Sequence, residues 1–223
     1  MLSSINYVWR LVGTGFAFAA FFGGGLLLAL TVFPLIALIK RDTIDRVRAT
    51  QAVIHRVFQF FVSMLEFLGI IRVDVRGVAT LQGGSGRLII ANHPTLLDVV
   101  ILMSLIPHAQ CIVKAELWRN RYLGGVMRWA GYIRNDLEPE ALLDACKVAM
   151  AEGKDLIIFP EGTRQLPDTP TDISQAVGFD HVPAAVRLNA CSAVIAAGRI
   201  GQAVLRRLRH WLGAAAEAIA EVA

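Results

Sequence analysis

A run of 29 residues without a charged side chain, Leu11 to Ile39, constrains the fold of this chain more than any other feature. About 20 apolar residues span a hydrocarbon core of roughly 30 Å, so the run is long enough to cross a bilayer. Glycines 23–25 and Pro34 interrupt it, which allows one helix bent near the glycines or a helix followed by an interfacial segment. The competing interpretation is a signal peptide, whose apolar core is only about 7–15 residues long. We therefore predict a retained membrane anchor over residues 1–40.

The charges that flank this run predict its orientation. Lys40, Arg41, Arg46 and Arg48 follow it, whereas Arg10 is the single basic residue before it. Basic residues concentrate on the cytoplasmic side of membrane segments. We expect everything after residue 40 to lie on the cytoplasmic side of the inner membrane.

Composition agrees with a membrane-associated protein. The apolar fraction is 55% and the charged fraction 18%, against about 45–50% and 25% in ordinary soluble domains. This excludes a disordered chain or a coiled coil, and a net charge of +4 without a basic cluster gives no reason to expect nucleic acid. Cys111, Cys146 and Cys191 are too few and too widely spaced for a disulfide framework or a zinc site, which indicates free thiols in a reducing compartment.

Helix-period and strand-like segments alternate after the apolar run. Residues 43–69 have helical periodicity with a wide apolar face, which suits either a core-facing helix or one lying on the bilayer. The alternation predicts an α/β fold, with a mixed, mainly parallel sheet flanked by helices and preceded by an N-terminal membrane helix. Helices are predicted over residues 43–69, 95–106, 115–131 and 139–152, and strands over 71–76, 88–91, 111–113 and 155–159.

The first candidate functional segment, residues 92–98, follows the apolar strand 88–91 and reads Asn-His-Pro-Thr-Leu-Leu-Asp. Proline favours the first helical position, so Pro94 leaves His93 outside the helix, where it can fold back to meet Asp98. A carboxylate on one imidazole nitrogen fixes the other nitrogen as an acceptor, as a general base requires. An isolated pair of this spacing is more often a structural histidine, and that alternative stays open here.

The second candidate segment, residues 159–164, follows the apolar strand 155–159 and reads Phe-Pro-Glu-Gly-Thr-Arg. Open α/β sheets bind ligands outside the carboxyl ends of their strands. Gly162 permits a tight turn with exposed amides, and the guanidinium of Arg164 matches a phosphate group. Glu161 can orient the arginine or a substrate hydroxyl. The alternative is a polar turn that simply leaves a strand.

Together the two segments resemble the glycerolipid (lysophospholipid/glycerol-3-phosphate) acyltransferase family, over about residues 70–164. The resemblance implies that His93 takes the proton from an acceptor hydroxyl and that Asp98 orients His93. It further implies that the acceptor phosphate is bound by five residues: Glu161, Gly162, Thr163, Arg164 and Lys114. Arg134 matches another basic position of the family only loosely.

Beyond Arg164 the chain departs from the family pattern. The family continues with a basic, glycine-containing turn and a Val-Pro-Val-like strand, whereas this chain reads Gln-Leu-Pro-Asp-Thr-Pro-Thr-Asp. We therefore expect an acyltransferase domain over residues 41–164 with an incomplete C-terminal part. Residues 165–223 are expected to be an atypical tail, translated out of the ancestral frame and lacking the last strands of the sheet. Within it, residues 201–222 suit a basic amphipathic helix.

The function implied by the resemblance is transfer of a fatty acyl group to the hydroxyl of a lysophosphatidic acid-like acceptor in phospholipid biosynthesis. The donor would be acyl-CoA or acyl-carrier protein, and the other partners would be the lysophospholipid acceptor and membrane lipids. No metal, cofactor or nucleic acid is implied. Two alternatives stay open: an acyltransferase for a different lipid acceptor, and a catalytically defective membrane protein truncated by a frameshift.

Overall fold

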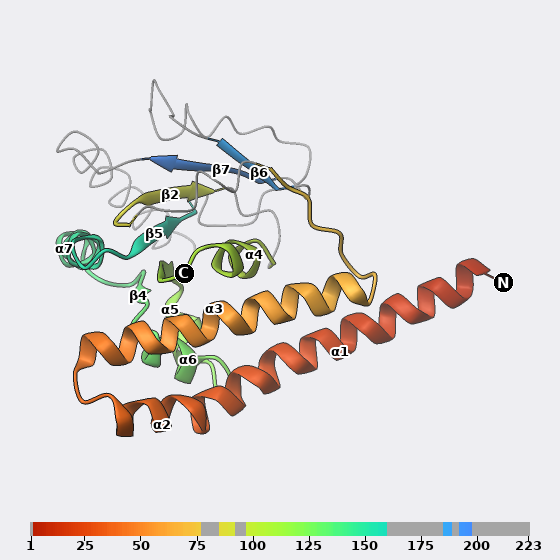
Figure 1. Cartoon of the computed structure of the whole chain (residues 1–223), viewed down its shortest axis with the longest axis horizontal. Helices are drawn as coiled ribbons and strands as arrows, with labels where there is room; N and C mark the ends of the chain where they lie inside the picture. The colour runs from red at the N-terminus through yellow and green to blue at the C-terminus, as the bar shows by residue number, and fades with distance from the viewer. Residues whose placement is uncertain (1, 77–84, 92–96, 160–184, 189–191, 198–223) are drawn as a thin grey trace.

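Figure 1 shows the computed structural model of the chain, which describes residues 2–76, 85–91, 97–159, 185–188 and 192–197. The apolar run forms two helices, α1 (Leu2–Leu30) and α2 (Val32–Ile39). Helix α1 continues through the three glycines, and the break comes at Thr31, whose hydroxyl donates to the carbonyl of Leu27 at 2.7 Å. Pro34 follows in the first turn of α2, where its missing N–H removes a bond to the preceding helix. The break therefore lies beside the proline and not at the glycines.

Helix α3 (Thr43–Phe67) confirms the helix predicted over residues 43–69. Asp42 caps it, because its carboxylate accepts from the backbone N–H groups of Ile44 and Asp45. One face of α3 is buried, and the opposite face exposes Phe60 and Phe67, which are 71% and 91% accessible. One face of α3 therefore packs on the core, and the other presents aromatic side chains on the molecular surface.

Helices α1 and α3 form an antiparallel hairpin (Figure 1). The ring of Phe21 packs against those of Phe58 and Phe61, with centroid separations of 6.1 and 5.5 Å. Near the open end, the indole Nε1 of Trp9 donates to the carbonyl of Leu68 at 3.0 Å. These contacts hold α1 against the C-terminal half of α3 and the residues that follow it.

The described strands form one mixed sheet in the order β1-β6-β7-β2-β5-β3-β4. The pairs β2–β5, β5–β3 and β3–β4 are parallel, and the pairs β2–β7, β7–β6 and β6–β1 are antiparallel. The predicted mixed α/β architecture is confirmed. The strands are β1 (Val75–Arg76), β2 (Leu88–Ala91), β3 (Ala109–Val113), β4 (Ile133–Arg134), β5 (Asp155–Ile158), β6 (Ala185–Leu188) and β7 (Ser192–Ala197).

Alternate side chains of the parallel strands enter two separate cores. Ile89 and Ile157 join the core that contains α3 and α4 (Leu97–Leu105), whereas Ile90 and Ile158 join a second core with α7 (Pro139–Ala151). This division follows the two-residue period of a strand. The sheet therefore separates the N-terminal hairpin and α4 on one face from α7 on the other.

Some predicted boundaries are wrong for identifiable local reasons. The single helix predicted after Lys114 is two short helices, α5 (Ala115–Arg119) and α6 (Gly124–Trp129). Between them the side-chain oxygen of Asn120 accepts from the N–H groups of Tyr122 and Leu123, which starts a new helix. The strand predicted over residues 71–76 is reduced to the two residues of β1.

The expectation that the tail lacks the last strands of the sheet is also wrong. Strand β7 pairs directly with β2, placing Ile90 opposite Ile195, and β6 joins β7 to β1. The segment after residue 164 thus supplies two strands, one of them beside the first motif-bearing strand. The amphipathic helix expected over residues 201–222 lies outside the described residues.

Candidate active site

The two candidate segments leave neighbouring parallel strands. Strand β2 ends at Ala91, directly before residues 92–96, and β5 ends at Ile158, shortly before residues 160–164. The two strands are in register, with Ile90 opposite Ile158. Parallel neighbours in register end at the same edge of the sheet, so both segments start from one place. His93, Glu161, Gly162, Thr163 and Arg164 themselves lie outside the described residues.

An ion pair at the opposite edge fixes this register. The backbone N–H and Nε of Arg87 donate to Oδ1 of Asp155 at 3.0 and 3.2 Å, and Nη2 donates to Oδ2 at 2.6 Å. Asp155 is buried at the first position of β5. A fork-to-carboxylate pair adds geometric specificity as well as energy. Arg87 and Asp155 therefore align the two strands whose far ends lead to the candidate segments.

Asp98, the predicted partner of His93, lies in the first turn of α4 and is 1% exposed. A carboxylate is almost never fully buried without a specific role or partner, and the N-terminal end of a helix stabilises negative charge. Asp98 is therefore a buried carboxylate at the start of the helix that follows the first candidate segment. The structure describes α4 from Leu97 onwards, so the predicted start at residues 94–95 lies outside the described residues.

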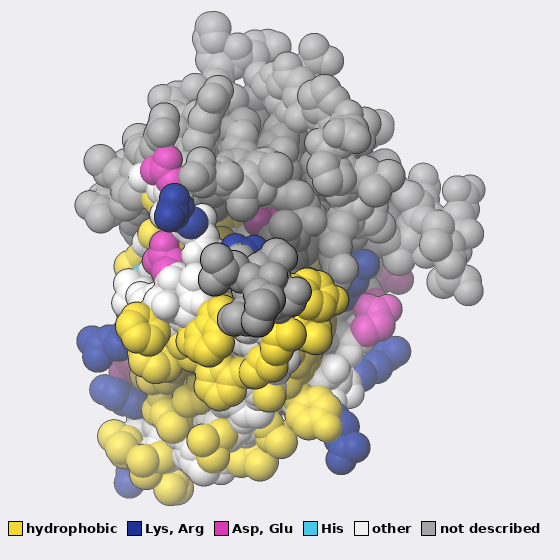
Figure 2. All heavy atoms as spheres, turned by 90° about the vertical axis from the view of Figure 1, so that its right-hand side faces the viewer, with side chains coloured by type: hydrophobic (Ala, Val, Ile, Leu, Met, Phe, Trp, Pro, Cys, Tyr) yellow, Lys and Arg dark blue, Asp and Glu magenta, His cyan; other side chains and the backbone are white. Residues whose placement is uncertain are grey.

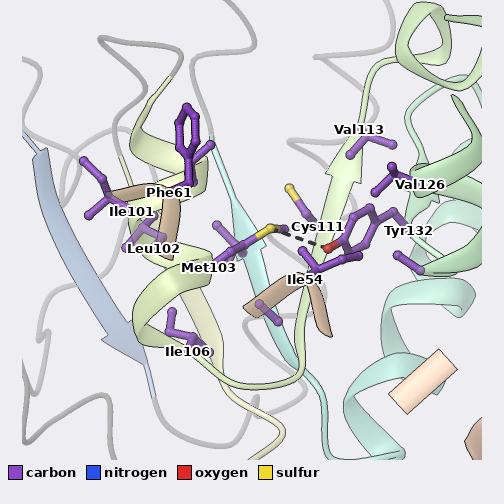
Figure 3. Close-up of a cluster of buried hydrophobic side chains, with 14 of the residues drawn as sticks. Ile54, Phe61, Ile101, Leu102, Met103, Ile106, Cys111, Val113, Val126 and Tyr132 are labelled. Atoms are coloured by element: carbon purple, nitrogen blue, oxygen red, sulfur yellow. Dashed lines mark hydrogen bonds between the residues drawn. The ribbon is translucent and has the colours of Figure 1, made fainter. Parts of the chain in front are cut away.

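Helix α4 is held rigidly against its neighbours (Figure 3). His55 of α3 contacts the carbonyl oxygen of Met103 through Nδ1 at 2.8 Å, so that nitrogen carries the proton and donates. The hydroxyl of Tyr132 donates to the sulfur of Met103 at 3.5 Å. Burial, with a smaller contribution from Cys111, raises the pKa of Tyr132 and keeps it a neutral donor. These contacts hold the helix that carries Asp98, a role for His55 that its isolated position in the sequence did not indicate.

Lys114 directly follows β3, which lies beside β5 in the sheet. It occupies the N-cap position of α5 with an exposed side chain. The next backbone N–H, that of Ala115, donates to the side-chain oxygen of Asn135 at 3.0 Å and ties this turn to the end of β4. The structure thus places Lys114 at the same carboxyl edge as the two candidate segments, with its ammonium group free to reach outward.

Arg134, the weaker candidate, is engaged locally. Its Nε and Nη2 donate to the two oxygens of Asp136 at 2.8 and 2.5 Å, and its guanidinium carbon lies 5.8 Å from the ring centre of Trp118. The hydrogen bond from Arg134 lowers the pKa of Asp136. The Arg134 side chain therefore links the end of β4 to Asp136 and Trp118.

The described residues contain no group of three metal-ligating side chains.

A mixed sheet with two candidate segments that leave one carboxyl edge is typical of α/β proteins that hold their ligands outside the strand ends. The comparison with protein families narrows that class, because the family model described as Acyltransferase matches residues 72–198, more than half of the chain. The chain belongs to the acyltransferase family. The match includes β6 and β7, in the segment that we expected to depart from the family.

One curated relative is a 1-acyl-sn-glycerol-3-phosphate acyltransferase of Helicobacter pylori strain J99. It is 34% identical over 103 residues, which cover 44% of this chain and 43% of the relative. The matched region is thus less than half the length of that relative. No solved structure matches the chain.

Proposed function

We propose that this protein transfers a fatty acyl group from a thioester donor, acyl-CoA or acyl-carrier protein, to the hydroxyl of a lysophosphatidic acid-like acceptor. The observation that carries the proposal is the register of β2 and β5, which starts both candidate segments from one edge of the sheet, with the buried carboxylate of Asp98 on the helix that follows the first segment. Membership of the acyltransferase family and the name of the Helicobacter relative support it.

In this proposal, His93 removes the proton from the acceptor hydroxyl as its oxygen attacks the thioester carbonyl. Asp98 orients the imidazole and stabilises its protonated form. The tetrahedral intermediate then breaks the carbon–sulfur bond, and the proton held by His93 goes to the departing thiolate. The products are an O-acyl ester and a free thiol. Charge stabilisation and a positioned base are sufficient for this step.

In this proposal the acceptor phosphate is held by residues 161–164, which follow β5 in the sequence, and by the lysine after β3. Arg164 offers a two-pronged fork to the phosphate oxygens, and Lys114 adds a mobile point charge from the neighbouring strand end. The other members of the phosphate site in this proposal are Glu161, Gly162 and Thr163.

Membrane association is part of the proposal, and it rests on the surface of the N-terminal hairpin. Residues 7–39 form the described helical segment that is long and apolar enough to cross a membrane, by length and composition. Figure 2 shows apolar side chains gathered on this end of the molecule, with Lys and Arg side chains on both sides of them. The large exposed apolar residues of α1, α2 and α3 are Tyr7, Val8, Trp9, Leu11, Val12, Phe16, Phe18, Leu27, Leu30, Leu35, Leu38, Ile39, Ile44, Phe60 and Phe67.

The packing of α1 favours an in-plane position in one leaflet over a complete span. The helix lies along α3, and α3 carries Arg48 and Arg56, which a spanning position would place beside hydrocarbon. An amphipathic hairpin lying in the interface keeps such residues in contact with water or headgroups. The basic residues at Lys40 and Arg41 support the cytoplasmic side of the inner membrane as the docking side.

The test is acyl transfer by the purified full chain in mixed micelles with lysophosphatidic acid and an acyl thioester. We expect release of free thiol together with formation of phosphatidic acid. Replacing the acceptor with monoacylglycerol, which lacks the phosphate, should reduce the rate strongly. An equal rate with both acceptors would favour a different lipid acceptor, and no thiol release with either would favour the catalytically defective alternative.

A further inference from the structure

The segment from Arg119 to Arg128 runs from the last residue of α5 through the connecting loop into α6. It places arginine side chains and an aromatic ring next to α1. It contains Arg119, Arg121 and Arg128 and no acidic residue. The side chain of Arg119 is 78% exposed, with Nη2 4.0 Å from Oδ2 of Asp136. Arg121 and Arg128 are exposed, and Nη1 of Arg128 donates to the carbonyl of Trp118 at 2.9 Å. Neither the acyl-transfer step nor the phosphate site described above uses this cluster.

This segment is built into the apolar hairpin surface. The ring of Tyr122 meets that of Phe22 on α1 edge to face, with centroids 6.2 Å apart, and remains 40% exposed. The guanidinium carbon of Arg121 lies 5.5 Å from the Tyr122 ring centre. An aromatic ring with an apolar side on the hairpin and a cation above it is typical of side chains at a membrane–water interface.

Hydrogen bonds within the chain and packing on α1 hold the backbone of this segment. Asn120 accepts from the N–H groups of Tyr122 and Leu123 at 2.8 and 3.1 Å, and its own carbonyl accepts from Gly124 at 2.8 Å. Leu123 is buried against Gly25 of α1. The backbone of the segment therefore loses little conformational entropy when the exposed arginines bind a charged surface.

We propose that residues 119–128 are a second membrane contact, which binds anionic phospholipid headgroups at the edge of the apolar hairpin surface. The inference rests on the membrane docking in the proposed function and adds a preference for lipid charge. Tyr122 lies at the level of the headgroups, and Arg119 and Arg121 reach the phosphates. Because the segment leads from Lys114 at the carboxyl edge of the sheet, the contact also directs that edge toward the bilayer surface.

The test measures partition of the full chain from detergent onto vesicles that contain no substrate, made of phosphatidylcholine alone or with about a third phosphatidylglycerol. Each basic residue near an anionic surface contributes about fivefold to partition. We expect Arg121→Gln to lower partition onto the anionic vesicles about fivefold and Arg119→Gln with Arg121→Gln about 25-fold. Partition onto neutral vesicles should be unchanged, and Arg121→Lys should retain most of the binding.

The matched control is Lys147→Gln on α7, on the other face of the sheet, where Lys147 pairs with Asp144 at 2.8 Å. It removes the same charge and should change partition less than twofold. The inference is overturned if Lys147→Gln lowers partition as much as Arg121→Gln, or if neutral and anionic vesicles lose binding equally. Thermal unfolding of each variant verifies that it is folded. Failure of the proposed function is separately visible, as absence of thiol release by the unaltered chain in neutral micelles.

Discussion

Asp98 is predicted as a site residue by its spacing from His93, and the structure adds that its carboxylate is buried. The spacing from His93 indicates a pair, but it does not reveal that the carboxylate is 1% exposed at the start of a helix. Helix α4, which carries Asp98, packs against α3 from another part of the chain. Lys114 was assigned through the family resemblance alone, and the structure places it directly after β3, which pairs with β5.

We predict that Asp98→Asn lowers acyl transfer by about 10²–10⁴-fold, the usual contribution of a positioned proton-transfer group. The amide has nearly the same shape but cannot stabilise the imidazolium, so the chain should stay folded. His93→Ala should be at least as damaging. The measurement is the initial rate of thiol release, with Asp144→Asn on the exposed side of α7 as the control. A variant at residue 93 that kept more than about a tenth of the rate would contradict the assignment.

We predict that two buried thiols are inert in the folded chain. Burial raises the pKa of Cys111 and of Cys146 to about 12, from an ordinary value of 9.0. At pH 8 the reactive thiolate is therefore almost absent. In a Cys191→Ser variant, a disulfide-exchange reagent at pH 8 should label these two thiols only after denaturant is added. Fast release of one equivalent before unfolding would contradict the burial.

The same shifts predict how stability changes at alkaline pH. Between about pH 9 and pH 12 the folded chain keeps thiol protons that the unfolded chain loses, so the free energy of unfolding decreases as pH rises through this window. Tyr132 acts in the same direction, because burial raises its pKa too. Denaturant unfolding at a series of pH values measures the decrease. A midpoint that is constant from pH 8 to pH 11 would contradict it.

At the scale of elements, the segments that begin and end with clear chemical signals were predicted well. Helix α3 begins after Asp42 and α7 begins at Pro139, both strong start signals, and Gly153 with its φ of +82° ends the latter. The two-residue strand β4 could not be predicted, because it has no period of its own and exists only through pairing with β3. Strand β7 was missed because its sequence, Ser-Ala-Val-Ile-Ala-Ala, lacks the family's proline pattern.

The contact between α1 and α6 depends on small residues, and we predict that Gly125→Ala weakens it. A Cβ at position 125 would lie 2.6 Å from the Cβ of Ala29, so one helix must move. Overpacking of this kind costs about 1–3 kcal/mol. Gly23→Ala is the control, since nothing lies within 4 Å of its added Cβ, and an exposed helical glycine replaced by alanine gains up to about 1 kcal/mol. Thermal unfolding in one detergent should move in opposite directions for the two variants.

At the scale of the whole molecule, the α/β fold class and both candidate segments could be predicted from the sequence, because they depend on short-range patterns. The position of α1 could not be predicted. An apolar run has the same composition whether it crosses a bilayer or lies along α3, and the close approach of Gly25 and Ala29 to α6 is visible only in three dimensions. The antiparallel half of the sheet was unpredictable for the same reason.

The reading-frame hypothesis for residues 165–223 remains a prediction that the gene sequence tests directly. The motivating observation is the loss of the basic, glycine-containing turn after Arg164. Read one base later, the codons for Gln175 and Ala176 must yield a lysine or arginine at their junction, because the last two bases of a glutamine codon and a following G allow only these. We expect the shifted frame to continue into a Val-Pro-Val-like strand. A stop within a few codons would disprove the hypothesis.

The position of β7 also determines the order in which the protein is assembled during synthesis. Ile90 of β2 is paired with Ile195 of β7, so the centre of the sheet cannot close until nearly all of the described chain has left the ribosome. Translation at about 5–20 residues per second separates these two strands by on the order of ten seconds. The α1–α3 hairpin needs only the first 70 residues and emerges well before that. If the hairpin docks on the bilayer as proposed, it does so first, and the edge of the sheet that bears the candidate segments forms afterwards.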